Sequence, residues 1–359
     1  MPIVNETNNE RWTMNDFFQS DGEYLAKEDG GFLSRVILDS KSKDNGKRLT
    51  TLELTFPRFV LSEFNTHRLL SKNSASSRAI PTHKQIAKLL EDPFVPSAET
   101  VRYNQGGMQG HTVLTDEDYA DFVRIWKKGR SRAVLTAMEL ILGEKEVEKA
   151  FGVGYTRLDD IFLSSDTREA AIDALKEHAA YTLAQRKETG SVEQERYLNV
   201  HKQTANRVIE PYVWHVVITS GTEWDNFWYL REDIDADPQI YKIAKLAHET
   251  YNASTPQELE MGQWHTPFVR AEEKAEAEND YELWKKVSSG RCARVSYETH
   301  SGTRDLSADE KLHSRLVTGK PHLSPLEHVA TPLESADETC GNFRGWFQHR
   351  KEVVDSQVF

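Results

Sequence analysis

The alternation of apolar and polar positions near the start of the chain predicts two β-strands. Segments 34–42 and 46–59 are rich in strand-forming residues and are joined by an Asn-Gly turn. In the second segment Leu52, Leu54 and Phe56 alternate with polar neighbours. A period of two is typical of a strand that buries one face. These segments therefore predict a hairpin whose second strand is half buried.

Longer segments carry the helical period. Apolar residues recur three and four positions apart over 116–142 and 167–188, with charges between them. Pro238 is placed to open a further helix over 238–251, because proline is favoured in a first helical turn. Segment 271–286 is rich in Glu and Lys and is expected to be a charged helix with a solvated face.

Several segments between these elements are less clearly patterned. We expect a helix from Pro57 to Leu70 that runs into a loop, and a loop over 81–115, which is rich in Pro, Gly and Gln. The β-branched and aromatic segment 211–220 fits either a buried strand or a core helix, and periodicity does not decide between them. Thr222 is the expected N-cap of the helix that follows.

Composition limits the classes of function. The 359 residues are 38% hydrophobic, which is enough for a core, but no apolar run reaches the roughly 18 residues of a membrane span. Cys292 and Cys340 form neither a CxxC pair nor a disulfide framework, and the polar N-terminus lacks the layout of a secretory signal. The net charge of −12 argues against a nucleic-acid face. A cytoplasmic protein, in a host cell if viral, with no nucleic-acid or membrane partner is expected.

One stretch departs from this acidic background. NTHRLLSKNSASSR brings Arg68 and Arg78 together with Ser74 and Ser76. Guanidinium groups match the geometry of phosphate, and hydroxyl groups can complete a cradle for a nucleotide. Residue types alone equally allow a polar surface loop, because serine-rich loops are common. His67 is open to two interpretations as well, a catalytic group or a helix-end residue that bonds a carbonyl.

The familiar motifs of other site classes are missing from the sequence. There is no HExxH or CxxC, so no metal site is expected. There is no GxGxxG after a strand and no P-loop, so a nucleotide would need another architecture. Ser76 has no GxSxG around it and is a poor candidate for a nucleophile.

The stretch resembles the signature of the flavin-dependent thymidylate synthases, Arg-His-Arg-x-x-Ser-x-Asn-x-x-Ser-x-Arg. The matching positions are His67, Arg68, Ser71, Asn73, Ser76 and Arg78. Three positions depart from the family pattern. Thr66 stands where the first Arg is expected, Ser74 where Glu is frequent, and Glu63 where Gln is usual.

Other stretches extend the resemblance. RVIEP looks like the family's Arg-x-x-x-Pro segment, which makes Arg207 a nucleotide ligand. DNFWYLRED looks like the helix that carries an Asn beside flavin and an Arg against the uracil ring, here Asn226 and Arg231. Trp224, Trp228 and Tyr229 around them are expected in the core, with flavin stacking as the alternative.

The C-terminal part resembles the N-terminal part of the family. Segments 290–300 and 319–332 are similar to segments that precede the signature, and they place His322 and Ser324 beside flavin. The chain then reaches a second His-Arg pair at 349–350, so the sequence looks circularly permuted, as in versions found in bacteriophages. Only the pair at 67–68 is followed by the Ser, Asn, Ser and Arg set, so we prefer it for the site.

The resemblance implies a complete biochemical assignment. The fold would be α+β, with a central mostly antiparallel sheet flanked by helices, in a single catalytic domain over 1–359 with 81–204 as a mainly helical insertion. The enzyme would be a homotetramer that uses FAD, with NADPH and methylenetetrahydrofolate as cosubstrates, to methylate dUMP at C5 and give dTMP. Chemistry at this centre depends on positioning and electrostatics, which the protein provides.

The resemblance also assigns a role to each site residue. Arg231 would be catalytic, as a cation that favours negative charge on the uracil. The substrate ligands would be Glu63, Ser74, Ser76, Arg78, Arg207 and Arg231, and the cofactor ligands Thr66, His67, Arg68, Asn226, His322 and Ser324. Because three of these positions are altered, modification of dCMP, hydroxymethylation of dUMP, or nucleotide binding without catalysis stay open as alternatives.

Overall fold

The computed structural model describes residues 2–4, 11–13, 25–104, 110–189, 196–276, 280–297, 304–318 and 320–355. The chain divides into two compact units. The first comprises Met1–Phe56, Val60–Ala75 and His215–Phe359, and the second comprises Pro57–Phe59 and Ser76–Trp214. The region 81–204, with its helices, thus lies entirely within the second unit.

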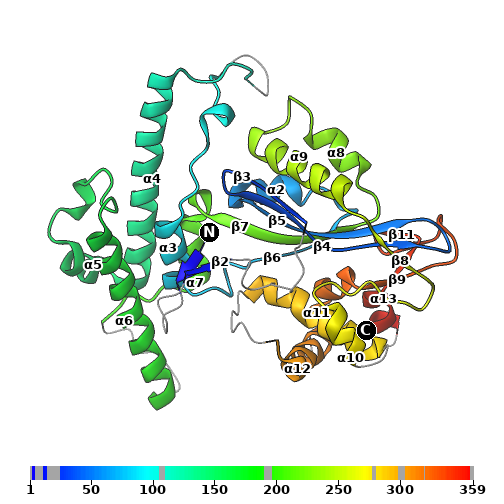
Figure 1. The fold of residues 1–359 in the computed structure, drawn as a ribbon. Coiled ribbons are helices and arrows are strands. Elements are labelled where there is room, and N and C mark those ends of the chain that lie inside the picture. The colour runs from blue at the N-terminus through cyan, green and yellow to red at the C-terminus, as the bar shows by residue number, and fades with distance from the viewer. Residues whose placement is uncertain are drawn as a thin grey trace. The chain divides into compact units, whose positions relative to one another are not determined.

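A six-stranded sheet forms the centre of the first unit (Figure 1). Its strands lie in the order β3 (Ala26–Asp29), β4 (Phe32–Ser42), β5 (Arg48–Pro57), β7 (Trp214–Gly221) and β6 (Ser71–Ser74), and β8 (Gln257–Leu259) lies beside β4. The pairs β3–β4, β4–β5 and β6–β7 are antiparallel, and β8 is parallel to β4. The fold is therefore α+β with a mostly antiparallel sheet, and the segment 211–220 forms a strand from Trp214 onward rather than a core helix.

The predicted hairpin of β4 and β5 is confirmed. Gly46 in its turn has φ of +74°, a conformation that glycine adopts without steric cost. The expectation that β5 is half buried is wrong, because Thr51 and Glu53 on its polar face are 0% exposed. Structure covers both faces of this strand, and the buried Glu53 is compensated by an ion pair with Arg35.

Helices of the first unit lie on both faces of the sheet. Figure 1 shows α8 (Asp225–Arg231) and α9 (Pro238–Ala253) on one face, and α11 (Tyr281–Tyr297), α12 (Leu306–Val317) and α13 (His349–Asp355) on the other. The remaining elements are α2 (Leu61–Phe64), α10 (Ala271–Glu276), the 3-10 turn η5 (Ser324–His328), and the paired strands β1 (Pro2–Val4) with β2 (Arg11–Thr13), β9 (Ala330–Pro332) with β12 (Trp346–Gln348), and β10 (Thr339–Cys340) with β11 (Phe343–Arg344).

The helix opened by Pro238 is confirmed, and Asp237 caps it by accepting from two backbone N–H groups. Thr222 is not a cap, because α8 begins at Asp225 with Trp224 before it. The single solvated helix over 271–286 is wrong too. The described residues form two helices there, and Lys285 is only 2% exposed. Lys285 is buried because it pairs with a carboxylate of α13, a contact that no local pattern encodes.

The helix expected from Pro57 to Leu70 is also wrong. Pro57 ends β5, a 3-10 turn (η1, Arg58–Val60) follows, and α2 lasts only four residues. The loop expected next is the strand β6, which pairs with the buried strand β7. Tertiary pairing thus overrides the weak local preference of Ser71–Ser74 for a loop.

The second unit is mainly helical. Its elements are α3 (Thr82–Glu91), η2 (Ala98–Thr100), α4 (Asp116–Leu142), α5 (Glu144–Phe151), η3 (Tyr155–Arg157), α6 (Ser165–Thr189), α7 (Lys202–Val208) and η4 (Glu210–Tyr212). The two long predicted helices are confirmed as α4 and α6. The loop expected over 81–115 is wrong at its start, where α3 forms because one of its faces is apolar.

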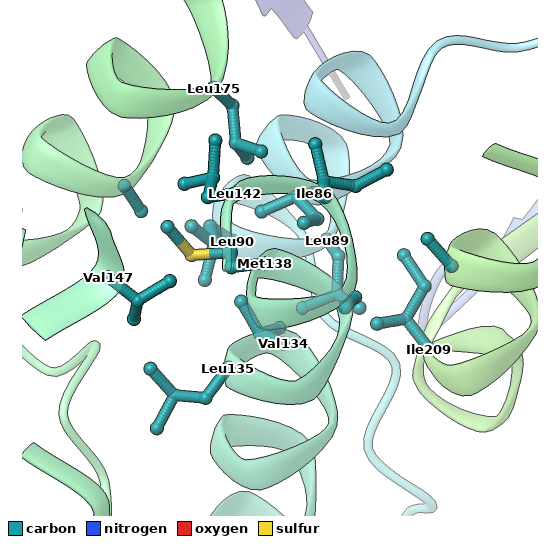
Figure 2. Packing of buried hydrophobic residues seen from close by; sticks show 14 of the residues in the cluster. Ile86, Leu89, Leu90, Val134, Leu135, Met138, Leu142, Val147, Leu175 and Ile209 are labelled. Carbon is teal, nitrogen blue, oxygen red and sulfur yellow. The ribbon is translucent and has the colours of Figure 1, made fainter. Parts of the chain in front are cut away.

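One hydrophobic cluster holds these helices together. Figure 2 shows Ile86 and Leu89 of α3 packed with Met138 of α4, and Val147 and Leu175 join from α5 and α6. Each fully buried side chain of this size contributes about 1.5–3 kcal/mol through removal of apolar surface from water. The helical periodicity of the sequence is therefore what assembles this unit.

Candidate functional site

Arg231 contacts three other predicted site residues of the first unit. Its Nε donates to Nε2 of His67 at 2.8 Å, and its Nη1 and Nη2 lie 3.3 Å from Glu63 Oε2 and Thr66 Oγ1. The His67 and Arg231 positions are 164 residues apart in the sequence. The Arg231 side chain as a whole is 19% exposed, so it is not fully enclosed by these contacts.

Aromatic packing fixes this arrangement. Phe227 of α8 is buried, and its ring meets the edge of His67 with centroids 4.9 Å apart. The same ring packs on Phe64 of α2 at 5.5 Å. The apolar face of α8 therefore places Arg231, at the end of that helix, over the turn that carries His67.

His67 is a neutral hydrogen-bond acceptor here. Burial, together with the charges of Arg231 and Lys72, lowers the pKa of His67 to about 4. Since an arginine Nε–H only donates, Nε2 of His67 accepts and the ring proton resides on Nδ1. His67 thus orients Arg231 and does not deliver a proton near neutral pH.

The surroundings of the Glu63 carboxylate change its pKa. Burial and the nearby Asp237 raise the pKa of Glu63, and Arg231 acts in the opposite direction. The resemblance places a glutamine at the position of Glu63. The ionised carboxylate can only accept hydrogen bonds, whereas an amide could also donate.

Lys72 is a site residue that sequence reasoning missed. Its Nζ donates to the carbonyl oxygens of His67 and Leu70 and so closes the turn below Arg231. Burial lowers the pKa of Lys72 to about 8, opposed by the charge of Glu327. The residue lies at an unspecified position of the signature, and no pattern in the sequence could have identified it.

Two signature residues have structural partners. Ser71 exchanges hydrogen bonds with Asn342, and Asn73 donates to the carbonyl of Cys292 at 3.3 Å. Both are buried on β6, and α11 and η5 pack against that strand. Ser74, half buried, faces Val217 of β7. The C-terminal segments that the resemblance relates to the signature therefore lie beside it in space.

The other predicted cofactor ligands of the first unit are surface residues. Arg68 follows His67, and Asn226 lies on α8. His322 precedes η5 and Ser324 begins it, and both are exposed. The four described residues 320–323 lead directly into this turn, while residue 319 and residues 298–300 of the related segments lie outside the described residues.

In the second unit, α7 is joined to the turn that contains Arg78. The amide of Asn206 donates to the carbonyl oxygens of Ser77 and Ile80, both at 2.9 Å. Arg78 and Arg207 are exposed and directly follow Ser77 and Asn206 in the sequence, and Ser76 accepts from the backbone of Arg78 at 3.3 Å. The backbone segments of three predicted nucleotide ligands thus adjoin this junction.

The charge of this junction is positive. Burial and the charge of Arg207 lower the pKa of Arg58, which Glu210 opposes through an ion pair of 3.3 Å. Within the part of the chain that is described, the side chains of Arg68, Arg78 and Arg207 form no ion pair. Exposed guanidinium groups without a carboxylate partner suit an anionic ligand.

The second His-Arg pair has a different setting. His349 is buried, contacts Glu352 at 2.7 Å and stacks on His313, and Arg350 forms an ion pair with Glu327. Both residues of this second pair therefore already have partners within the protein. Trp224 and Trp228 are buried as expected, but the core assignment of Tyr229 is wrong, because it is 80% exposed.

Among the described residues, no group of His, Cys, Asp or Glu could hold a metal ion. The helices within the described ranges include none that is both long and apolar enough to cross a bilayer. No family model matches the chain, and no curated protein matches it.

Proposed function

We propose that this protein is a flavin-dependent thymidylate synthase that methylates dUMP at C5, with FAD as cofactor and NADPH and methylenetetrahydrofolate as cosubstrates. The supporting observation is the hydrogen bond from Arg231 to His67. The resemblance assigns these residues to uracil and flavin on independent motifs, and a contact between them is what a shared site requires. A homotetramer in the cytoplasm is part of the proposal.

The packing of the C-terminal part supports a permuted version of the family fold. α11 and η5, which derive from segments similar to those that precede the signature, pack on β6 within the signature. Circular permutation preserves such contacts because only the connections between elements change. We accordingly propose the family's fold for the whole chain, with residues 81–204 as its helical insertion.

The donor set fits the groups that this function needs. Arg68, Arg78 and Arg207 are exposed cations that would hold the phosphates of the nucleotide and of FAD, and Asn226, His322 and Ser324 offer polar contacts for the flavin. When bound, the flavin supplies the hydride that completes the methyl group. No protein nucleophile is required.

Arg231 would stabilise the developing charge. Its guanidinium, held by His67, would lie against the uracil ring and favour negative charge as C5 becomes nucleophilic. A preorganised donor at such a position is typically worth about 3 kcal/mol of transition-state stabilisation. His67 stays neutral and keeps the guanidinium oriented, which avoids reorganisation during the reaction.

Glu63 favours dCMP as a second candidate substrate. Its carboxylate lies 3.3 Å from Arg231 and can only accept a hydrogen bond when ionised. The exocyclic amino group of cytosine donates, whereas O4 of uracil accepts, and a carboxylate is the usual partner of that amino group. The glutamine usual in the family could serve either edge.

Tritium release from C5-labelled nucleotides tests both candidates. Purified protein is given FAD, NADPH and methylenetetrahydrofolate, and release from dUMP is compared with release from dCMP; product mass distinguishes methylation from hydroxymethylation. Glu63→Gln should shift preference toward dUMP by about tenfold or more. The change removes the mismatch between two acceptors, the carboxylate and O4 of uracil, and such a mismatch costs over about 1 kcal/mol. Flavin binding without release from either nucleotide would contradict the catalytic proposal and favour a nucleotide-binding role.

A further inference from the structure

A chain of hydrogen bonds crosses the interior of the first unit. His265 Nδ1 contacts Ser40 Oγ at 2.8 Å, and His265 Nε2 contacts Thr51 Oγ1 at 2.8 Å. Thr51 Oγ1 contacts Ser220 Oγ at 2.6 Å, which in turn contacts His328 Nδ1 at 2.8 Å. All five side chains are 0% exposed. This chain of hydrogen bonds runs from β4 through β5 and β7 to η5, the turn that begins at Ser324.

Both histidines in the chain are neutral. Burial lowers the pKa of His265 well below 6.5 and that of His328 to about 3. A neutral imidazole donates from one nitrogen and accepts at the other. The direction of each hydroxyl in the chain therefore determines which nitrogen of each ring carries the proton.

One end of the chain determines that direction. Gln257 of β8 donates its amide to Ser40 Oγ at 3.2 Å, so the Ser40 hydroxyl is free to donate to His265 Nδ1. Nε2–H of His265 then donates to Thr51, Thr51 to Ser220, and Ser220 to His328 Nδ1. In the reverse direction, the hydroxyl hydrogen of Ser40 would lack an acceptor among the described residues. The reverse direction would thus leave two buried polar groups unpaired, the Ser40 hydroxyl hydrogen and His328 Nε2, whereas the first direction leaves only His328 Nε2 unpaired; the reverse direction is therefore disfavoured.

The other end of the hydrogen-bond chain has no further partner among the described residues. His328 Nε2 is buried and has no hydrogen-bond partner in the described part of the protein. The favoured direction makes this atom an N–H group. The chain cannot conduct a proton, because the Gln257 amide that begins it is not an acid. It can only fix a tautomer.

We propose that the chain from Gln257 to His328 locks His328 in the tautomer with its proton on Nε2, and that His328 is a positioning residue for η5. The lock fixes the ring of His328 against Ser220 of the sheet, and so fixes the turn that carries Ser324. The link to flavin rests on the proposed function, in which Ser324 lies beside that cofactor. The tautomer itself does not depend on the function.

Ser40→Ala tests the lock from its far end. This change removes the hydroxyl that sets the direction, four hydrogen bonds away from His328, without touching η5. Two-bond nitrogen–proton correlation spectra of ¹⁵N-histidine-labelled protein report the tautomer, with the two rings assigned from His265→Gln and His328→Gln. Wild type should show Nε2–H at both rings, and Ser40→Ala should show a mixture of tautomers at His328. The matched control is Ser34→Ala, which removes another 0%-exposed hydroxyl of β4 that has no partner in the described residues.

FAD affinity, measured by quenching of flavin fluorescence, tests the positioning role. Ser40→Ala should raise the Kd for FAD about 5- to 10-fold, the equivalent of about one hydrogen bond, and Ser34→Ala should not. A proton on Nδ1 of His328 in wild type, or an unchanged tautomer in Ser40→Ala, would overturn the lock. A mixed tautomer with unchanged FAD affinity would overturn the positioning role. If wild type binds no FAD, the proposed function fails, while the spectra still decide the lock.

Discussion

Replacing Arg231 by methionine should change the titration of His67. The change keeps the apolar stem but removes three contacts, of which the one to His67 Nε2, at 2.8 Å, is the shortest. Burial is the main cause that lowers the pKa of His67 to about 4, and Arg231 is the next. In Arg231→Met the pKa should therefore rise above 4 and stay below 6.5, because burial and Lys72 persist.

The same change should lower stability. At pH 7 it leaves Nε2 of a largely buried His67 without a donor, at a cost of about 1–3 kcal/mol. NMR titration, with His67 assigned from His67→Gln, measures the pKa, and urea unfolding measures the free energy. Arg68→Met is the matched control, because the exposed Arg68 makes no contact with this ring. A pKa that stays at about 4 together with an unchanged unfolding free energy would refute the contact and its proposed role.

Three further changes test the packing and the buried histidines. In the folded protein the pKa values of His313 and His328 are about 4 and 3, below the unfolded value near 6.5. The stability that the two neutral rings contribute is therefore fully present above pH 6.5 and is lost as the pH falls through 4 and 3. Urea unfolding at several pH values measures this loss. Gly290→Ala would place its Cβ 2.5 Å from the backbone oxygen of Asp309, so α11 and α12 must separate, and the melting temperature should fall with a loss of about 1–3 kcal/mol. Met138→Ala should destabilise the helical unit by about 2–5 kcal/mol in urea unfolding, and an exposed apolar residue on the same helix should tolerate alanine within about 0.5 kcal/mol.

Local periodicity was sufficient for elements whose own sequence determines them. Helix α4 begins where Thr115 accepts from the backbone of Asp118 and ends before Gly143, whose φ is +85°, and both signals can be read from the sequence. The strand β6 could not be predicted, because Ser71–Ser74 has little strand propensity and pairs only where β7 offers an edge. Lys285 is similar, since its burial depends on Glu352, which lies 67 positions away.

The candidate site likewise contains residues that the sequence predicted and residues that it did not. His67 and Arg231 were predicted as site residues because their segments resemble motifs of a known family, and the structure adds the contact between them. Lys72 and the chain from His265 to His328 carried no motif. Their roles depend on burial and on hydrogen-bond partners from several strands, and neither is visible in a linear pattern.

The two His-Arg pairs show why position in a motif does not determine chemistry. His349 contacts a carboxylate, and its hydrogen bond to Glu352 is the main cause that lowers the pKa of Glu352 to about 2. His67 contacts a guanidinium, and burial together with that charge keeps its ring neutral, so that it accepts a hydrogen bond. The charge of Arg350 is already balanced by Glu327, which makes Arg350 a poor partner for a phosphate. Arg68 has no such carboxylate partner among the described residues. The pair at 67–68 is therefore the one whose electrostatics suit an anionic ligand.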